Sequence, residues 1–294
     1  MIREYVLSKT VEETVGILNR NNGKAMVIAG GTDLAVDLRA ETVDVEVLVD
    51  VTRIEGDGFH DIVFDGGYVI MGAGVTMAEI AANERIRASV PSLAKATGSV
   101  GSVQIRNAAT VAGNIVKAQP AADSSVMLSA LGAEITIYGT NGLRDVQVRD
   151  AHIAVGQSVI DPRKEVVTKI KFNEPQKNQG ASFVRISQRK ALATPIINVG
   201  AMISVNNEKI EWARIFMAPV GPRPMRATDA EDFLIGKPLL ESVFKEAGAL
   251  AVNNARPLTH LVWGSKEYKL ALLPTLVARA LKEAVDEIKA KGGM

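Results

Sequence analysis

The alternation of apolar and polar positions divides the 294-residue chain into three stretches, and the first covers residues 1–55. After Thr10, apolar residues recur at helical spacing, and Thr10 and Glu13 have the spacing of a helix capping box. Short apolar runs at 25–29 and 45–51 predict buried strands. We therefore expect a small α/β unit of three short strands, assembled in βαβ fashion.

The second stretch, residues 56–174, has the pattern of an antiparallel sheet with helices. A hairpin is predicted where apolar runs at 62–64 and 68–71 flank Asp65-Gly66-Gly67. Gly72-Ala73-Gly74 resembles the start of a dinucleotide fingerprint, but the capping-box spacing of Thr76 and Glu79 explains it as a strand–turn–helix junction. Further strands are expected at 132–138, 143–148 and 166–172, and helices at 91–97 and 123–131.

The third stretch, residues 175–294, predicts a three-stranded sheet followed by helices. The strands are expected at 182–187, 196–205 and 209–218, and the helices at 227–234, 240–254 and 265–291. The apolar face of the last helix is interpreted as core packing rather than as a partner-binding face. The predicted fold class is α+β, with domains at 1–55, 56–174 and 175–294.

Composition excludes several classes of function. The 34 Lys and Arg nearly balance the 33 Asp and Glu, so no basic stripe indicates nucleic acid or anionic lipid as a partner. The chain has no cysteine, which excludes disulfides, a thiolate nucleophile and cluster ligands from this chain. His60, His152 and His260 lack metal-ligand spacing, so no metal site is predicted and each is expected to be a surface or packing residue.

The first residues carry charge where a signal peptide needs an apolar run, and no apolar stretch approaches the roughly 18 residues of a membrane span. We therefore expect no membrane span and a cytoplasmic protein.

Residues 27–34 carry the first candidate chemistry. The apolar run ending at Ala29 is followed by Gly30 and Gly31, and a helical pattern then begins at Asp33. Such a junction leaves backbone N–H groups unpaired at the start of a helix, and glycines let a phosphate approach them closely. The segment therefore indicates an anion site, most simply for a nucleotide, and the alternative is a tight turn without a ligand.

Residues 98–127 form the second candidate ligand-binding segment. This stretch is rich in small residues, has low charge and shows no clear helical or strand period. It predicts a loop whose backbone lies against a flat ligand, with Thr110, Asn114 and Asp123 as polar groups. The alternative is a packed irregular loop.

Two motifs stand about eighty residues apart: Ala29-Gly-Gly-Thr-Asp33 and Thr110-Val-Ala-Gly-Asn-Ile115, the latter preceded by Gln104-Ile-Arg-Asn107. In this order and separation they resemble the FAD-binding subunit of the molybdenum hydroxylases, which includes the medium subunit of carbon monoxide dehydrogenase and the flavin part of xanthine dehydrogenase. The resemblance covers nearly the whole chain, including Ile186–Lys190, Ile196–Val199 and Gly236–Leu239.

The resemblance implies an FAD held between the first two domains. Residues 28–34 would take the pyrophosphate through backbone N–H groups and the Thr32 hydroxyl. Asp123 would lie near the flavin end, and Val167 would lie near the adenine or along the cofactor. The implied cofactor-binding residues are Val27, Ile28, Ala29, Gly30, Gly31, Thr32, Asp33, Leu34, Gly101, Ile105, Ala109, Thr110, Gly113, Asn114, Val116, Asp123 and Val167.

The chain departs from the family pattern at three places. Ala112 replaces the first glycine of the usual Gly-Gly-Asn, and its methyl group is tolerated if φ is negative. Val184 holds the place of a lysine that many relatives carry near the flavin, with Arg185 beside it. The usual aromatic residue before the small-residue segment is missing.

The resemblance further implies an oxidoreductase subunit that transfers electrons and has no catalytic residues of its own. Its partners would be a large chain with the molybdenum cofactor, a small [2Fe-2S] chain and an external electron acceptor. Substrate specificity would then belong to the large chain. The alternatives are a free-standing flavin oxidoreductase and a non-catalytic scaffold subunit that has lost flavin.

Overall fold

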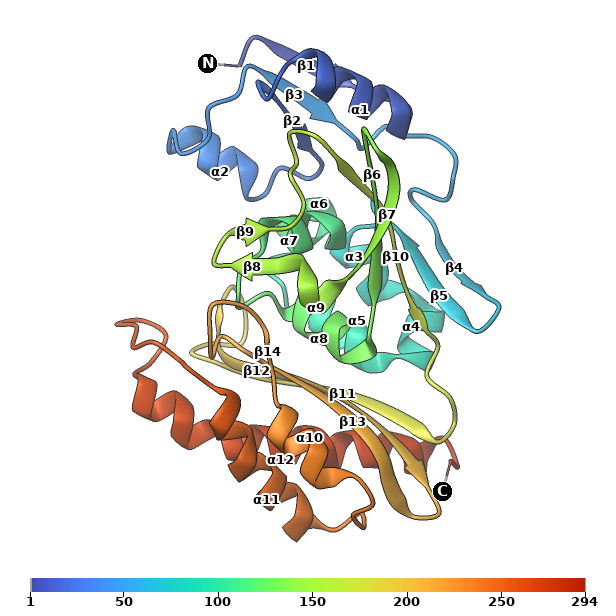
Figure 1. Cartoon of the computed structure of the whole chain (residues 1–294), viewed down its shortest axis with the longest axis vertical. Coiled ribbons are helices and arrows are strands. Elements are labelled where there is room, and N and C mark those ends of the chain that lie inside the picture. The colour runs from blue at the N-terminus through green and yellow to red at the C-terminus, as the bar shows by residue number, and fades with distance from the viewer. Residues whose placement is uncertain (1, 294) are drawn as a thin grey trace.

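The computed structural model describes residues 2–293, and in it three sheets of three or more strands follow one another along the long axis of the molecule (Figure 1). Each sheet is built from one stretch of the chain, in chain order. Among the described residues, no helix combines the length and apolar character that a membrane crossing requires.

The first unit is a parallel three-stranded sheet of order β1-β3-β2. Its elements are β1 (Glu4–Leu7), α1 (Val11–Arg20), β2 (Ala25–Ile28), α2 (Leu34–Arg39) and β3 (Val47–Asp50). The expected βαβ-like unit is confirmed. Thr10 caps α1 by accepting the Glu13 N–H at 3.0 Å, but the Glu13 carboxylate accepts the Lys9 N–H and not that of Thr10, so the box is displaced by one residue.

The middle unit is an antiparallel five-stranded sheet of order β4-β5-β10-β6-β7. Its strands are β4 (Ile62–Asp65), β5 (Tyr68–Gly72), β6 (Glu134–Gly139), β7 (Gly142–Gln147) and β10 (Val166–Asn173). Helices α3 (Met77–Ala82), α4 (Glu84–Ser89) and α5 (Pro91–Gly98) follow β5, and α9 (Val148–Ala151) with the small hairpin β8 (His152–Ala154) and β9 (Gln157–Ser158) follows β7. The capping box of Thr76 and Glu79 is complete and starts α3.

The small-residue stretch 98–127 is helical, so the prediction of an irregular loop is wrong. It contains α6 (Val103–Ala108), α7 (Val111–Lys117) and the start of α8 (Asp123–Leu131). The Ser102 and Thr110 hydroxyls cap α6 and α7 by accepting the backbone N–H three residues later. Helices of six and seven residues are too short for an apolar period to emerge, which is why the sequence pattern missed them.

The C-terminal unit is an antiparallel sheet of order β11-β12-β13-β14 with helices on one face. Its elements are β11 (Gln179–Ser187), β12 (Pro195–Asn206), β13 (Lys209–Ala218), β14 (Met225–Arg226), α10 (Thr228–Leu234), α11 (Glu241–Ala251), the 3-10 turn Val252–Asn254 and α12 (Lys266–Ala290). The sheet has a fourth strand, β14, beyond the three expected, because the chain resumes pairing with β13 after Pro219, Pro222 and Pro224.

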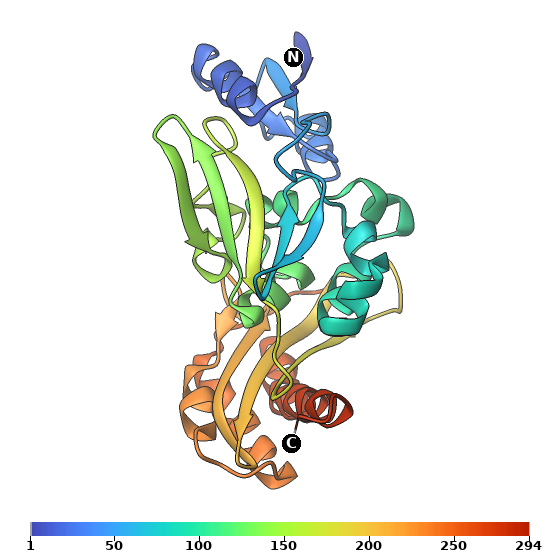
Figure 2. The same cartoon turned by 90° about the vertical axis from the view of Figure 1, so that its right-hand side faces the viewer.

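Both faces of the C-terminal sheet are covered. Phe183, Met202 and Phe216 join the core of the middle unit, whereas their neighbours Val184, Ile203 and Met217 join a core with α10, α11 and α12. This alternation follows the two-residue repeat of a strand. Figure 2 shows the sheet between the helices of the middle unit and α12. All residues of β12 from Pro195 to Val205 are therefore buried.

Candidate functional site

The two glycine-bearing segments meet, although about eighty residues separate them. Gly30 follows β2, and a Cβ placed on it would lie 1.8 Å from the carbonyl oxygen of Ala108 at the end of α6. Only glycine allows this approach of one backbone to another. Lys117 on α7 and Asp37 on α2 form an ion pair at 2.5 Å that joins the same two units.

A cleft of about 280 Å³ lies at this junction. It is lined by Ala29, Gly30, Val51, Thr52, His60, Gly74, Thr76, Glu79, Asn107, Ala108 and Thr110. Three of these, Ala29, Gly30 and Thr110, belong to the predicted site. Its volume is near the lower end of ligand pockets, which suits one part of an extended dinucleotide.

The backbone donors of the first segment face no protein acceptor. Within residues 2–293, the N–H groups of Gly30, Gly31, Thr32 and Asp33 make no hydrogen bond. Gly31 has φ of +65°, a conformation that glycine adopts readily. Glu79 also lines the cleft, and its carboxylate is held by hydrogen bonds that it accepts from the Thr76 N–H and hydroxyl, each at 2.7 Å. The residues present therefore fit a diphosphate group.

The opposite wall is the start of α7. The Thr110 hydroxyl accepts the Gly113 N–H at 3.0 Å, and Asn114 accepts a hydrogen bond from Ser124 at 2.7 Å through its side-chain oxygen. Ala112 lies inside α7 and is not among the residues with positive φ, so its methyl group fits the helical backbone and is buried in the core. The replacement of glycine at this position thus does not disturb the segment.

Asp123 lies in a buried polar cluster where the middle and C-terminal units meet. Its carboxylate accepts hydrogen bonds from Ser99 at 3.0 Å and Asn198 at 2.5 Å, and it faces the Nε atom of Arg185 at 3.5 Å. Burial raises the pKa of the Asp123 carboxyl, and the Arg185 charge and the hydrogen bonds from Asn198 and Ser99 oppose that rise.

Arg185, not residue 184, supplies the cation at this cluster. Val184 points into the C-terminal core, and the next residue on β11 points to the other face. The Arg185 guanidinium donates to the carbonyls of Ser99, at 3.0 Å, and Ala193. The Nε of Arg185 and the side-chain oxygen of Asn198 are buried without a hydrogen-bond partner among the described residues.

The other predicted residues do not line the cleft. Val27, whose N–H donates to the Pro162 carbonyl at 2.9 Å, and Ile28 belong to β2. Leu34 begins α2, and Ala109 accepts the Met77 N–H through its carbonyl at 2.8 Å. Gly101 packs under Ile105, which is exposed on α6, whereas Val116 and Val167 pack in or against the core of the middle unit.

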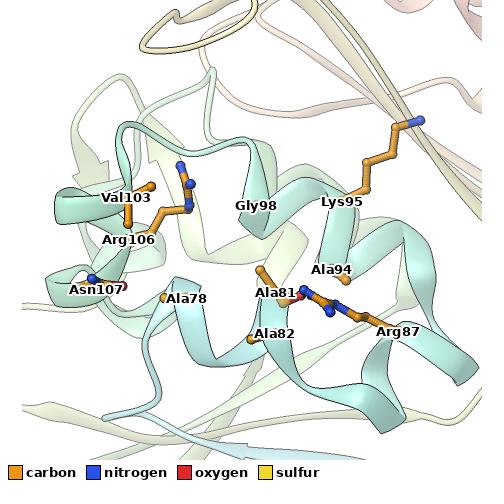
Figure 3. A pocket seen from close by; sticks show the side chains of 10 residues that line it. All are labelled: Ala78, Ala81, Ala82, Arg87, Ala94, Lys95, Gly98, Val103, Arg106 and Asn107. Atoms are coloured by element: carbon orange, nitrogen blue, oxygen red, sulfur yellow. Dashed lines mark hydrogen bonds between the residues drawn. The ribbon is translucent and has the colours of Figure 1, made fainter.

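A second, wider pocket of about 470 Å³ lies between α3, α5 and α6 and shares Asn107 with the cleft (Figure 3). Four of its ten lining residues are alanines, Ala78, Ala81, Ala82 and Ala94. Its cations do not converge: Arg87 donates to the Ala81 carbonyl, Arg106 donates to the Val100 carbonyl, and Lys95 pairs with Glu283.

Sequence reasoning missed several residues of the site. Asn198 lies within Ile196–Val199 and Arg185 directly precedes Ile186–Lys190, two segments that resembled the family, but no spacing rule connects either residue with Asp123. His60 enters the cleft wall from the loop before β4, where Gly72 and Gly74 pack closely against residues 58–60. Gly72 and Gly74 are therefore explained by close packing against this loop and not by a phosphate-binding fingerprint. Among residues 2–293 no group of three or more His, Cys, Asp or Glu side chains is arranged to hold a metal ion.

Two family models match the chain. Residues 1–174 match the FAD binding domain in molybdopterin dehydrogenase, and residues 182–284 match the CO dehydrogenase flavoprotein C-terminal domain.

Curated relatives align over most of their length. The chain is 27% identical to the nicotinate dehydrogenase FAD-subunit of Eubacterium barkeri over 80% of each chain. It is 27% identical to the glyceraldehyde dehydrogenase medium chain of Sulfolobus acidocaldarius, covering 95% of this chain and 97% of the relative. It is 25% identical to the carbon monoxide dehydrogenase medium chain of Hydrogenophaga pseudoflava over 96% of each.

Solved structures share the fold. A chain of carbon monoxide dehydrogenase from Hydrogenophaga pseudoflava superimposes with a TM-score of 0.91 at 24% identity, covering 98% of both chains. A chain of quinoline 2-oxidoreductase from Pseudomonas putida gives 0.88 at 25% identity, covering 100% of this chain and 99% of the other. The arrangement of the three units is thus that of these chains.

Proposed function

The chain belongs to the family of the FAD binding domain in molybdopterin dehydrogenase, and on this premise we propose which of its residues hold the cofactor and which chains it works with. It is the FAD-binding medium subunit of a molybdenum hydroxylase complex and hence an oxidoreductase component. When bound, FAD supplies the redox chemistry itself, so the residues of this chain bind it, orient it and set its electrostatic surroundings.

We assign the diphosphate to the cleft between Gly30 and Ala108. The proposal rests on one observation above all: the N–H groups of residues 30–33 make no hydrogen bond among the described residues, and Gly30, the first of them, lies against the backbone of Ala108 from a distant segment. They would donate to the phosphates together with the Thr32 hydroxyl, and Thr110 and Gly113 would form the opposite wall. Val27, Ile28, Ala29, Leu34, Ala109 and Asn114 complete this part of the proposed site.

We assign the flavin end to the cluster around Asp123. Its buried carboxylate and the Arg185 guanidinium give a fixed pair of opposite charges, and the side-chain oxygen of Asn198 has no hydrogen-bond partner within residues 2–293. Such a pair holds hydrogen-bonding groups in place, and no acid–base pair is needed for chemistry that belongs to the cofactor. Gly101, Ile105, Val116 and Val167 are proposed as further contacts along the cofactor.

The same reasoning extends to the domains and partners. The strands of the three sheets fall within 1–55, 56–174 and 175–294, and we propose these ranges as the domains. The relatives named medium chain or FAD-subunit imply companion chains. We propose a large molybdenum-cofactor chain, a small [2Fe-2S] chain that compensates for the absence of cysteine here, and an external acceptor. A cytoplasmic location stays a prediction.

The purified chain tests the proposal through its visible spectrum. Flavin absorption bands at one FAD per chain, lost when Gly30 or Gly31 is replaced by valine, would support the placement. Absence of flavin after addition of FAD would instead favour a scaffold that has lost it. Copurification of molybdenum and iron–sulfur chains would argue against a free-standing flavin oxidoreductase.

A further inference from the structure

Arg214, on β13, carries a positive charge that nothing in the described chain neutralises. It pairs across the sheet with Met202, so its side chain lies on the face turned toward the middle unit. The sulfur of Met202, 3.5 Å from Nη2, is the one acceptor that residues 2–293 offer its guanidinium. Its Nε is buried without a partner, and no carboxylate in this range forms an ion pair with it. Because a partly buried charge without oxygen acceptors is costly, its presence favours a role in binding an anion.

The neighbours of Arg214 position its guanidinium without neutralising it. The Cζ atom lies 4.8 Å from the centre of the Trp212 ring. Gly132 ends α8 at a φ of +71°, and a Cβ on Gly132 would overlap Nη1 of Arg214, so only glycine leaves room for the guanidinium at this helix end. The ring face and the partial negative charge of the helix end offset part of the cost of burial. Among the described residues, however, no carbonyl of α8 accepts a hydrogen bond from the guanidinium.

Two further arginines stand close to Arg214. Strand β14 pairs with β13, which places Arg226 on the same face as Arg214, as its diagonal neighbour. Helix α9 begins against the end of α8, because the Val148 N–H donates to the Ala133 carbonyl at 2.8 Å, and Arg149 is the next residue. The three guanidinium groups therefore come from β13, β14 and α9, where the middle and third units meet.

Two carboxylates stand among these arginines, and each is already paired. Glu231 accepts a hydrogen bond from Arg226 at 2.8 Å and another from a backbone N–H at 2.7 Å, and Asp150 pairs with its neighbour Arg149 at 3.3 Å. Burial lowers the pKa of the Arg214 guanidinium, and the charges of Arg226 and Arg149 lower it further. Glu231 opposes that shift. Three guanidinium groups against two carboxylates leave one positive charge without a counter-charge.

We propose that Arg214, Arg226 and Arg149 form a binding site for an oxyanion, that is, for a phosphate or carboxylate group, and we call these three residues the arginine site. A guanidinium presents parallel N–H donors that match two oxygens of such a group. The oxyanion supplies both the counter-charge and the acceptors that residues 2–293 do not give Arg214. The side chains of Arg226 and Arg149 are 40% and 38% exposed, so a ligand in solution can reach the site.

The arginine site is separate from the proposed cofactor site. None of its three residues is assigned to FAD, and Arg214 stands at the opposite end of α8 from Asp123. The inference therefore does not depend on the proposed function. Because Arg214 belongs to the third unit and Arg149 to the middle unit, a bound oxyanion also fastens the two units to each other.

Equilibrium dialysis of the purified full chain against radiolabelled inorganic phosphate tests the proposal. In low-salt buffer we expect phosphate to bind at the arginine site, and added sodium chloride should weaken the binding. Arg214→Met should lower the affinity about tenfold or more, because it removes the central charge-assisted hydrogen bonds. Phosphate held in the proposed diphosphate cleft would be unaffected by this change. Equal phosphate binding by the unaltered chain and by Arg214→Met would overturn the proposal.

A second variant and a control separate the site from general charge effects. Arg214→Lys keeps the charge and covers the case in which methionine disturbs the fold. It should bind phosphate several-fold more weakly than the unaltered chain, since an ammonium lacks the paired planar donors. Arg279→Met is the matched control, because it removes an exposed arginine of α12 on the other face of the same sheet and should leave phosphate binding unchanged. A loss in Arg279→Met as large as that in Arg214→Met would contradict a specific site.

Thermal unfolding gives an independent measurement. In phosphate-free buffer Arg214→Met should unfold at a higher temperature than the unaltered chain, because it removes an unpaired charge. Phosphate should raise the midpoint of the unaltered chain by roughly 2–4 °C more than that of the variant. This comparison cancels the general stabilising effect of phosphate as an excluded salt. A lower midpoint for Arg214→Met, with the same phosphate shift in both proteins, would show a purely structural arginine.

The complete complex distinguishes the source of the oxyanion. Phosphate binding that Arg214→Met removes in both the isolated chain and the complex would assign the site to a free phosphate-bearing molecule. Such binding in the isolated chain alone would assign the site to a carboxylate that a companion chain supplies. Arg214→Met should keep its FAD in either case. If the unaltered chain binds no FAD, the proposed function fails, and the phosphate measurement still decides the arginine site.

Discussion

Gly30 lies so close to Ala108 that a single added carbon atom on Gly30 would overlap the Ala108 carbonyl oxygen, at 1.8 Å. At this point the first and middle units meet backbone against backbone. The proposed diphosphate site depends on this contact, because the free N–H groups of residues 30–33 lie beside it.

Replacing Gly30 with alanine should separate the two units and release FAD. The Cβ meets backbone that cannot rotate away, so we expect loss of flavin absorbance after gel filtration and a lower thermal midpoint. Gly16→Ala is the control, because a Cβ there meets only a flexible arginine at 3.6 Å and should stabilise α1 by roughly 0.5–1 kcal/mol. Stoichiometric FAD in Gly30→Ala would contradict the assignment.

Replacing Lys117 with glutamine should weaken FAD binding modestly. The ion pair with Asp37 holds α7 against α2 beside the cleft, and both side chains are less than one-third exposed. A partly buried ion pair contributes about 1 kcal/mol to the contact that it holds. Its loss should therefore lower the affinity for FAD about fivefold, measured by fluorescence titration. The unaltered chain should lose part of its affinity in high salt, whereas the variant should lose less. Equal salt dependence would argue against a role for the pair.

Asp123→Asn should destabilise the chain by about 3 kcal/mol or more, measured by urea unfolding. The change leaves the Arg185 guanidinium, only 11% exposed, without its counter-charge. Adding Arg185→Met should recover part of the loss, and a double-mutant cycle gives the coupling. Additive effects of the two changes would show that they do not interact. A shift of the flavin absorption maximum in Asp123→Asn would further support its place at the flavin end.

Stability should fall as the pH drops below neutrality because of His152. This side chain is 1% exposed, its ring nitrogens have no partner among the described residues, and burial lowers its pKa from 6.5 to about 4. Between those values the unfolded chain binds a proton that the folded chain does not, so stability is present above pH 6.5 and is lost as the pH falls toward 4. The loss amounts to about 3 kcal/mol at the acid end.

Urea midpoints at pH 7 and pH 5 measure this loss. His152→Leu should show a smaller drop between the two pH values than the unaltered chain, whatever its stability at pH 7. An identical drop in both proteins would assign the acid sensitivity to other groups.

The long elements were predictable from the sequence, because hydrophobic period and caps act locally. Strands β4 and β5, the sheet of the third unit and α12 lie close to their predicted ranges. Helices α6 and α7 were missed because small residues such as Ala108 and Gly113 leave no apolar period, although Ser102 and Thr110 stood at the capping positions.

The meeting of distant groups could not be predicted from spacing. Neither motif indicates that Gly30 reaches Ala108, and that pairing came only from the family resemblance. The sequence alone could not show whether residue 184 or residue 185 faces Asp123. Adjacent strand residues point to opposite sides of a sheet, so the answer required knowing which face of β11 is turned toward the middle unit. The cluster of Asp123 and Asn198 joins residues from two units and has no local signal.

The burial of β12 on both faces has a consequence for the modularity of the chain. A Cβ placed on Gly200, in the middle of β12, would lie only 3.0 Å from the Val126 carbonyl oxygen of α8. The sheet of the third unit therefore packs directly against the second unit and covers part of its core. A fragment that stops at residue 174 would expose Val126 and Met127 to water and should aggregate instead of folding alone. Recombination between relatives at that boundary would have to preserve the shape of the packed interface between β12 and α8.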